Sequence, residues 1–176
     1  MNRTIMKSAT VILLLMAAGC SRQPSRENRT VTITAVTFEQ WQQRLVNYKS
    51  EIVVVDFWAT WCTPCVESFP HMLKMYEKYR VRGVRFVSMN LDDRSDAQAL
   101  EMALDFLVKQ KALFENYRMD EKVPDAFEKL DLQSIPAVLI YDRTGKLRRR
   151  LTGDNPNAQF TDEDVEKAIQ DLLGSA

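Results

Sequence analysis

The sequence contains few cysteines, histidines and glycines, and neither sign of charge is in excess. Its 176 residues include three cysteines, one histidine and five glycines, and 24 basic side chains balance 24 acidic ones. Structural zinc sites usually need about four Cys or His ligands, and the sequence has few residues of these two types. Nucleic-acid-binding proteins usually concentrate basic charge on one face, which a balanced total argues against. We therefore expect no nucleic-acid partner and no structural metal site.

The first nineteen residues have the pattern of a secretory signal. Arg3 and Lys7 are basic, and the apolar stretch that follows ends at residue 19. This stretch is shorter than the roughly 20 residues that a helix needs to span a bilayer. It leads into Ala17-Ala18-Gly19-Cys20, which resembles the lipobox of bacterial lipoproteins. The resemblance implies removal of residues 1–19, a lipid on Cys20, and a chain anchored to a membrane outside the cytoplasm.

The remaining chain divides into a short tether and one domain. Residues 20–30 are polar, so we expect the lipidated cysteine to be followed by a flexible segment. Residues 31–176 then suffice for a single domain with a sizeable core. Ala17 stands where lipoboxes most often have leucine, so an ordinary signal peptide with an incidental cysteine is the alternative.

Hydrophobic patterns predict alternating strands and helices, which together describe an α/β sandwich with a mixed central sheet. The run 52–58 is apolar except for Asp56 and suits a central strand covered on both faces. Leu100, Leu104, Leu107 and Val108 are predicted to form the inner face of one helix. The full prediction has strands at 31–36, 52–58, 84–91, near 114–119, 137–142 and 146–151. It has helices opened by Thr37 with Gln40, near Cys62, by Ser95 with Gln98, near Pro124, and by Thr161 with Asp164.

Cys62 and Cys65 are the candidate reactive pair. Cys62 follows a buried strand where a helix is predicted to begin, and a helix N-terminus favours a thiolate over a thiol. Residues three apart on a helix lie close enough for a disulfide to form and break locally. We expect Cys62, nearer the helix tip, to attack a substrate disulfide and Cys65 to resolve the mixed disulfide. A bare C-x-x-C also occurs in zinc and copper sites, so the motif alone leaves a metal site open.

Two motifs resemble those of thioredoxins. Residues 53–65, Val-Val-Val-Asp-Phe-Trp-Ala-Thr-Trp-Cys-Thr-Pro-Cys, look like the thioredoxin active-site strand and helix, and Ser134-Ile135-Pro136-Ala137-Val138 resembles the cis-proline loop. With the signal sequence and the long segment before Leu132, the chain looks like the TlpA/ResA-like branch of membrane-tethered bacterial thioredoxins. The resemblance implies a three-layer α/β/α sandwich with an extra segment before the cis-proline strand. It also implies that Pro136 is cis opposite Cys62, where the backbone of Ile135 pairs with substrate.

The same resemblance draws attention to a carboxylate and a tryptophan. Asp56 matches the buried carboxylate six positions before the first cysteine of thioredoxins. Burial should raise its pKa and make it a proton acceptor for Cys65; the alternative is a solvated, idle residue at the strand end. Trp61 is expected near the surface, shielding the pair and contacting substrate, with Trp58 buried.

The predicted function is thiol–disulfide exchange on protein substrates outside the cytoplasm, without a cofactor and with a membrane electron donor that recycles the cysteine pair. Many ResA-like proteins carry a Glu three residues after the second cysteine, and that position here is Ser68. This departure weakens a role as a cytochrome c maturation reductase and favours a more general one. The motif also leaves open a thiol peroxidase and a non-enzymatic metal carrier that uses the two thiolates.

Overall fold

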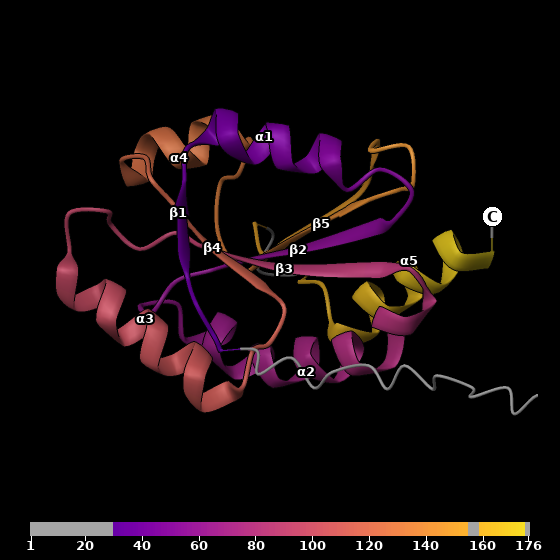
Figure 1. Cartoon of the computed structure of the whole chain (residues 1–176), viewed down its shortest axis with the longest axis horizontal. Coiled ribbons are helices and arrows are strands. Elements are labelled where there is room, and N and C mark those ends of the chain that lie inside the picture. The colour runs from indigo at the N-terminus through magenta and orange to yellow at the C-terminus, as the bar shows by residue number, and fades with distance from the viewer. Residues whose placement is uncertain (1–29, 155–158, 175–176) are drawn as a thin grey trace, which may run out of the picture.

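The chain folds as a central sheet between two layers of helices (Figure 1). The computed structural model describes residues 30–154 and 159–174. The three-layer α/β/α sandwich predicted from the sequence is confirmed. The predicted signal segment and the lipidated Cys20 lie outside the described residues. No helix within the described ranges is long and apolar enough to cross a membrane.

The sheet is mixed, with four parallel strands followed by an antiparallel pair. Its order is β1-β4-β3-β2-β5-β6, so the two strands that begin the chain do not lie side by side. Strands β1 to β4 run parallel, whereas β5 runs antiparallel to β2, and β6 antiparallel to β5. The strands are β1 (Thr34–Val36), β2 (Ile52–Trp58), β3 (Val84–Asn90), β4 (Glu115–Met119), β5 (Ala137–Tyr141) and β6 (Leu147–Thr152).

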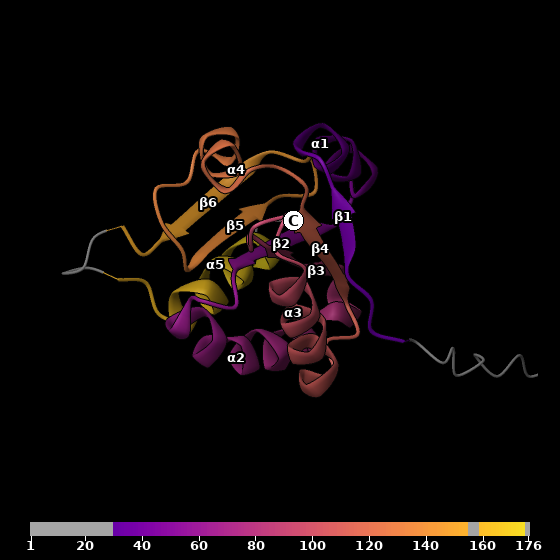
Figure 2. The ribbon, with the colours of Figure 1, turned by 90° about the vertical axis from the view of Figure 1, so that its left-hand side faces the viewer.

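Helices α1 and α4 cover one face of the sheet, and α2, α3 and α5 cover the other (Figure 2). Parallel strands need such crossover helices, and they bury the sheet on both sides. The helices are α1 (Phe38–Asn47), α2 (Thr63–Tyr79), α3 (Ala97–Gln110), α4 (Val123–Leu130) and α5 (Asp162–Gly174), with a short 3₁₀ turn η1 (Arg80–Arg82) after α2.

Strand β2 lies inside the sheet and is buried along its whole length. Its side chains alternate between the two helix layers, as the strand period requires. Val54 and Trp58 belong to the hydrophobic cluster under α2, α3 and α5, whereas Val55 and Phe57 belong to the cluster under α1. The continuous apolar run in the sequence therefore marks a strand with both faces covered.

Three details of the predicted elements are wrong. The first strand begins at Thr34 rather than Val31, because only its last three residues pair with β4. Helix α3 is capped by Asp96 instead of Ser95, since the Asp96 carboxylate accepts the Ala99 N–H at 3.0 Å. Val108 is half exposed rather than inward, because the helix turns Ala103 and Leu107 into the core.

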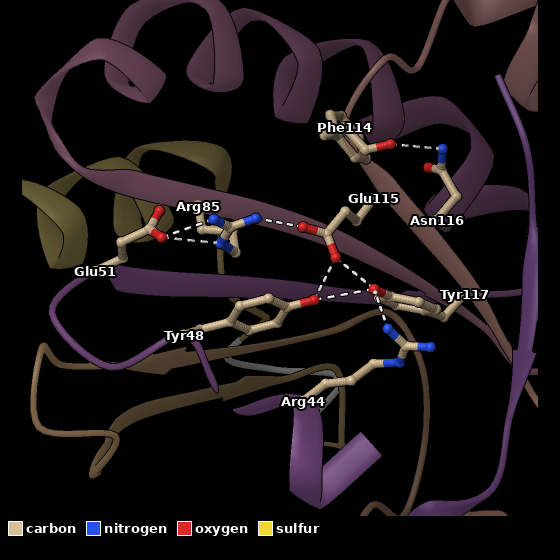
Figure 3. Close-up of polar contacts among 8 residues, drawn as sticks. All are labelled: Arg44, Tyr48, Glu51, Arg85, Phe114, Glu115, Asn116 and Tyr117. Carbon is tan, nitrogen blue, oxygen red and sulfur yellow. Dashed lines mark hydrogen bonds and ion pairs between the residues drawn. The ribbon is translucent and has the colours of Figure 1, made fainter. Parts of the chain in front are cut away.

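The segment between Leu113 and Leu132 supplies β4 and α4, so it is part of the sandwich. Glu115 accepts hydrogen bonds from the hydroxyls of Tyr48 and Tyr117 and pairs with Arg85 (Figure 3). Arg85 also binds Glu51 at 2.7 Å. These residues, the Glu115 network, tie β4 to β3 and to the end of α1. They lie near the amino ends of β3 and β4, whereas Cys62 follows the carboxyl end of β2.

Candidate active site

Cys62 and Cys65 form a disulfide at the start of α2. Cys62 is the N-cap residue, and its Cα lies 5.3 Å from that of Cys65. Pro64 stands in the first turn, where its missing N–H has no partner to lose. The sequence predicted that the pair follows a buried strand and stands at the start of a helix, and the structure confirms this location.

The pair is sheltered beside an exposed tryptophan. Cys65 is 1% exposed and packs in the cluster that contains Trp58 and Phe69, whereas Cys62 is 5% exposed. Trp61 is 58% exposed, and Trp58 is fully buried, as predicted. Both cysteines thus lie in the same buried cluster, and they differ in position along α2: Cys62 stands at the tip next to the exposed Trp61, and Cys65 lies one turn further in.

A buried polar group fixes the loop that leads into Cys62, and sequence reasoning missed it. Asp92 accepts the Thr60 N–H at 3.1 Å and the Thr60 hydroxyl at 2.9 Å. Asn90 donates to the same carboxylate at 2.7 Å. Both residues end β3 or follow it, beside the carboxyl end of β2. The signal that could have found them is a pair of polar residues directly after a buried parallel strand, where functional loops gather.

The Ile135–Pro136 peptide bond is cis, as the resemblance implied. The loop is tied to the end of β6, because the Gly153 N–H donates to the Pro136 carbonyl at 3.0 Å. A Cβ at Gly153 would lie 3.5 Å from Pro136, in ordinary contact distance. Ser134 also donates to Asp154 at 2.5 Å. Contact of Ile135 and Pro136 with a substrate stays a prediction, as does that of Trp61.

Asp56 lies in the middle of β2 and is 5% exposed, so the solvated alternative is wrong. By strand alternation it faces the same side as Val54 and Trp58, the side on which Cys65 packs. Burial, with a smaller contribution from the charge of Asp162, raises the pKa of Asp56 from its ordinary 3.8 to about 7. A carboxyl group with this pKa can accept or release a proton near neutral pH.

Ser68 and His71 follow the cysteine pair on α2. Ser68 donates its hydroxyl to the Cys65 carbonyl at 3.2 Å, so its side chain is bonded to the backbone of its own helix. The side chain of His71 is about half exposed, and its Nδ1 lies 3.1 Å from the Asp162 carboxylate. Within residues 30–154 and 159–174, no three His, Cys, Asp or Glu side chains are grouped so that they could hold a metal ion.

Comparison with known proteins agrees with this geometry. The thioredoxin family model matches residues 32–109. The chain is 23% identical to the thiol-disulfide oxidoreductase ResA of Geobacillus thermodenitrificans, over 97% of each chain. It is 29% identical to ResA of Bacillus cereus, over 66% of this chain and 63% of that one. A crystal structure of a candidate thiol:disulfide interchange protein DsbE from Chlorobium tepidum superposes with a TM-score of 0.59. The two proteins are 30% identical in sequence, and the match covers 73% of this chain and 84% of the Chlorobium tepidum chain.

The disulfide at a helix N-terminus, the cis-proline loop and these relatives lead to one assignment. The sheet and its helices have the thioredoxin-like arrangement, and the pair Cys62–Cys65 carries out thiol–disulfide exchange. The chain belongs to the thioredoxin superfamily, as a ResA/TlpA-like thiol–disulfide oxidoreductase.

Proposed function

We propose that this chain reduces or exchanges protein disulfides outside the cytoplasm, with Cys62 as the attacking and Cys65 as the resolving residue. The observation that carries the proposal is the asymmetry of the pair. Cys62 is the N-cap of α2 and follows the exposed Trp61, whereas Cys65 lies one turn inside the helix. The helix N-terminus stabilises negative charge on the outer sulfur, which is therefore the nucleophile.

The reaction proceeds through two exchanges of one sulfur–sulfur bond. The Cys62 thiolate attacks a substrate disulfide, forms a mixed disulfide and releases one substrate thiolate. Cys65 then loses its proton and attacks the Cys62 sulfur, which forms the Cys62–Cys65 disulfide and releases the second substrate thiolate. Two electrons pass from the pair to the substrate, and a donor must return two electrons before the next cycle.

Asp56 is the proposed acceptor of the Cys65 proton. It faces the side of the sheet on which Cys65 packs, and its pKa of about 7 suits proton transfer at neutral pH. Trp61, Ile135 and Pro136 are the proposed substrate contacts. The cis bond of Ile135–Pro136, which the resemblance to thioredoxins implies, and the exposure of the Trp61 indole ring next to Cys62 in the chain support this role.

The proposed location follows from the sequence at the N-terminus. Lipid attachment at Cys20 would hold the domain at a membrane surface outside the cytoplasm, where substrate disulfides persist. Such an anchor places the pair beside membrane proteins, so the proposed electron donor is a membrane thiol–disulfide carrier. Ser68, in place of an acidic residue, supports general substrates over dedicated cytochrome c maturation.

The test is reduction of insulin by the purified full chain with dithiothreitol as electron source. We expect Cys62→Ser and Cys65→Ser each to lose turnover, and Cys65→Ser to accumulate mixed disulfides through Cys62. Cys20→Ser is the matched control, since it removes a thiol outside the pair and should keep wild-type turnover. Full activity in Cys62→Ser would show the proposed mechanism to be wrong.

Two further measurements separate exchange from peroxide reduction and from metal transport. A peroxidase assay with hydrogen peroxide should show no more turnover than a Cys62→Ser control. Titration of the reduced chain with Cu⁺ or Zn²⁺ should show no tight one-to-one complex. Rapid peroxide turnover, or a stoichiometric metal complex in a chain inert toward insulin, would replace exchange with a peroxidase or a metal carrier.

A further inference from the structure

The end of the sheet opposite the cysteine pair carries an apolar side chain that the fold leaves in solvent. Val81 is 77% exposed, more than any other large apolar residue that the structure describes. It stands in η1 between Arg80 and Arg82, which are both exposed, and Arg80 pairs with Glu77 at 3.1 Å. The turn η1 leads into β3, so it lies where the parallel strands begin, whereas Cys62 follows the carboxyl end of β2.

Three turns meet at this end of the sheet and form one surface. The Ile52 N–H donates to the Gly83 carbonyl at 3.0 Å, which joins the start of β2 to η1. The Ser50 N–H donates to the Arg143 carbonyl at 2.8 Å, which joins the connection after α1 to the turn between β5 and β6. Figure 1 shows the three connections at the end of the molecule where β2 begins. We call this surface the amino-end face, and it consists of residues 49–51, 80–83 and 142–146.

The amino-end face has an excess of positive charge, although the chain as a whole has none. The acids of the face and its border are each paired with an arginine: Glu51 with Arg85 at 2.7 Å, Asp142 with Arg148 at 2.6 Å, and Asp171 with Arg149 at 3.8 Å. Further cations of the face have no ion-pair partner among the described residues, and these are Lys49, Arg82, Arg143 and Lys146. Their charges are therefore available to an anionic partner.

The described part of the chain also begins at this end. Strand β1 runs parallel to β4, and β4 runs parallel to β3, so Thr30 lies toward the end of the sheet where these strands begin. Cys20 precedes Thr30 by ten residues, and a chain spans at most about 3.5 Å per residue, so the two lie within about 35 Å of each other. A lipid on Cys20 would therefore hold the amino-end face close to the bilayer.

The chemistry of the face matches that of a bilayer surface with anionic lipids. Such a surface attracts lysine and arginine side chains that lie within a Debye length of it. An apolar side chain flanked by arginines suits the boundary between headgroups and acyl chains, because the arginines can bind phosphates while the apolar group is withdrawn from water. Val81 with Arg80 and Arg82 has this arrangement.

We propose that the amino-end face docks on a bilayer that contains anionic lipids, with Val81 among the headgroups and the unpaired cations on the lipid phosphates. This inference rests on the proposed attachment through Cys20 and adds an orientation to it. Strand β2 has seven residues that rise about 3.3 Å each, so the cysteine pair stands on the order of 20 Å from the docked face. The pair then points away from the bilayer, toward proteins that project from the membrane.

The test is fluorescence quenching in the full chain purified from bacterial membranes and reconstituted on vesicles whose acyl chains carry bromine. One vesicle is phosphatidylcholine alone, and the other is an equal mixture with phosphatidylglycerol. Val81→Trp should gain a quenched component on the mixed vesicles and not on the neutral ones. Wild type should show none, because its exposed Trp61 lies at the opposite end of the sheet. Met102→Trp, at an exposed apolar position of α3, is the matched control and should also show none.

The role of the cations is tested in the Val81→Trp chain. A cation near an anionic surface strengthens binding about fivefold, so Arg82→Gln and Lys49→Gln should each lower the ratio of docked to free domains about fivefold. Lys122→Gln, at the exposed N-cap of α4 beyond the carboxyl end of β4, should leave the ratio unchanged. Salt at about 1 M should remove the quenching while the chain stays on the vesicles. Circular dichroism and insulin turnover that match wild type show that each variant folds.

Flotation of the vesicles separates this inference from the proposed attachment. If wild type floats with both kinds of vesicle but Val81→Trp is quenched on neither, the chain is attached and the docking of the amino-end face is wrong. Equal quenching of Val81→Trp on both kinds of vesicle, or equal quenching of Met102→Trp, would also overturn the docking. If wild type floats with neither kind, the attachment fails, and the docking that rests on it fails with it.

Discussion

At the residue scale, the largest conflict between stability and chemistry lies at Asp56. The other residues of β2 are apolar, and among the described residues the Asp56 carboxylate has no ion-pair partner. A carboxyl group buried in this way remains protonated until about pH 7, whereas the unfolded chain releases the proton near pH 3.8. The fold therefore becomes less stable as the pH rises between these values.

The first prediction follows from this sign. A rise in pKa from 3.8 to about 7 corresponds to roughly 4 kcal/mol of destabilisation at pH 8 and to none below pH 3.8. Asp56→Asn should therefore gain unfolding free energy relative to wild type between pH 4 and pH 8. Guanidinium unfolding of the oxidised wild-type and Asp56→Asn chains at pH 4 and at pH 8 measures this difference in unfolding free energy. Asp105→Asn, at an exposed position of α3, is the control and should gain nothing.

A second prediction concerns the loop before the cysteine pair. Asp92 is 2% exposed and holds Thr60 and Asn90, so Asp92→Ala leaves buried donors without partners. We expect a loss of about 2–4 kcal/mol in unfolding free energy, together with slower attack by Cys62. Asp93→Ala, at an exposed neighbour whose side chain accepts hydrogen bonds from Ser95, should cost much less. Equal losses in the two variants would contradict the anchoring role of Asp92.

Sequence reasoning found the site residues whose signals are local. The C-x-x-C spacing and the strand before it identify Cys62 and Cys65, whereas Pro136 was predicted from the resemblance of residues 134–138 to the cis-proline loop of thioredoxins. Asp56 was predicted because it matches the buried carboxylate of thioredoxins and because its charge interrupts an apolar run. The pair of His71 and Asp162 could not be found, because these residues lie 91 positions apart and meet only when α5 packs on α2.

At the element scale, helix and strand ends that depend on neighbours in the chain were predicted accurately, and ends that depend on distant contacts were not. Strand β2 and the box of Thr37 and Gln40 at α1 were predicted to the residue, since both depend on neighbours in the chain. The start of β1 depends on how far β4 extends beside it, so the alternation of residues 31–36 overstated the strand. Ser and Asp are both favoured as N-cap residues, so the sequence does not distinguish Ser95 from Asp96. The hydrogen bond from the Ala99 N–H to the Asp96 carboxylate identifies Asp96 as the cap.

The third prediction belongs to β4. Burial disfavours ionisation of Glu115, but hydrogen bonds from Tyr117 and Tyr48 and the charge of Arg85 outweigh it, so the pKa of Glu115 lies below its ordinary 4.5. The unfolded chain thus takes up this proton first as the pH falls. The stability that the network provides is present above about pH 4.5 and disappears as the pH falls through the lowered pKa.

Glu115→Gln tests this directly. It keeps the shape of the side chain, removes its charge and should lower the unfolding free energy at pH 7 more than at pH 3. Denaturant unfolding at both pH values measures the difference, and Glu128→Gln on the exposed side of α4 is the control. A loss in Glu115→Gln that is the same at both pH values would mean that the network does not act through its charge.

At the scale of the whole molecule, the fourth prediction concerns attachment. If Cys20 carries lipid, the wild-type chain expressed in a bacterium should be recovered with the membranes, and its mass should include a diacylglyceryl group. Cys20→Ser should be recovered in the soluble fraction with exchange activity retained, whereas Cys62→Ser should stay with the membranes. A Cys20→Ser chain that remained membrane-bound at wild-type abundance would place the anchor elsewhere.

The position of β1 at the edge of the sheet has a mechanical consequence for a protein held by its N-terminus. A pull on residue 30 reaches β1 first, and β1 is joined to the sheet by three register pairs with β4. Two whole strands, β4 and β3, separate it from β2, which leads into the cysteine pair. Under load the edge strand would peel away before the strand that carries the site is stretched. If the chain is anchored through Cys20, as proposed, the short first strand would detach before a pull reaches the strand that leads into the reactive disulfide.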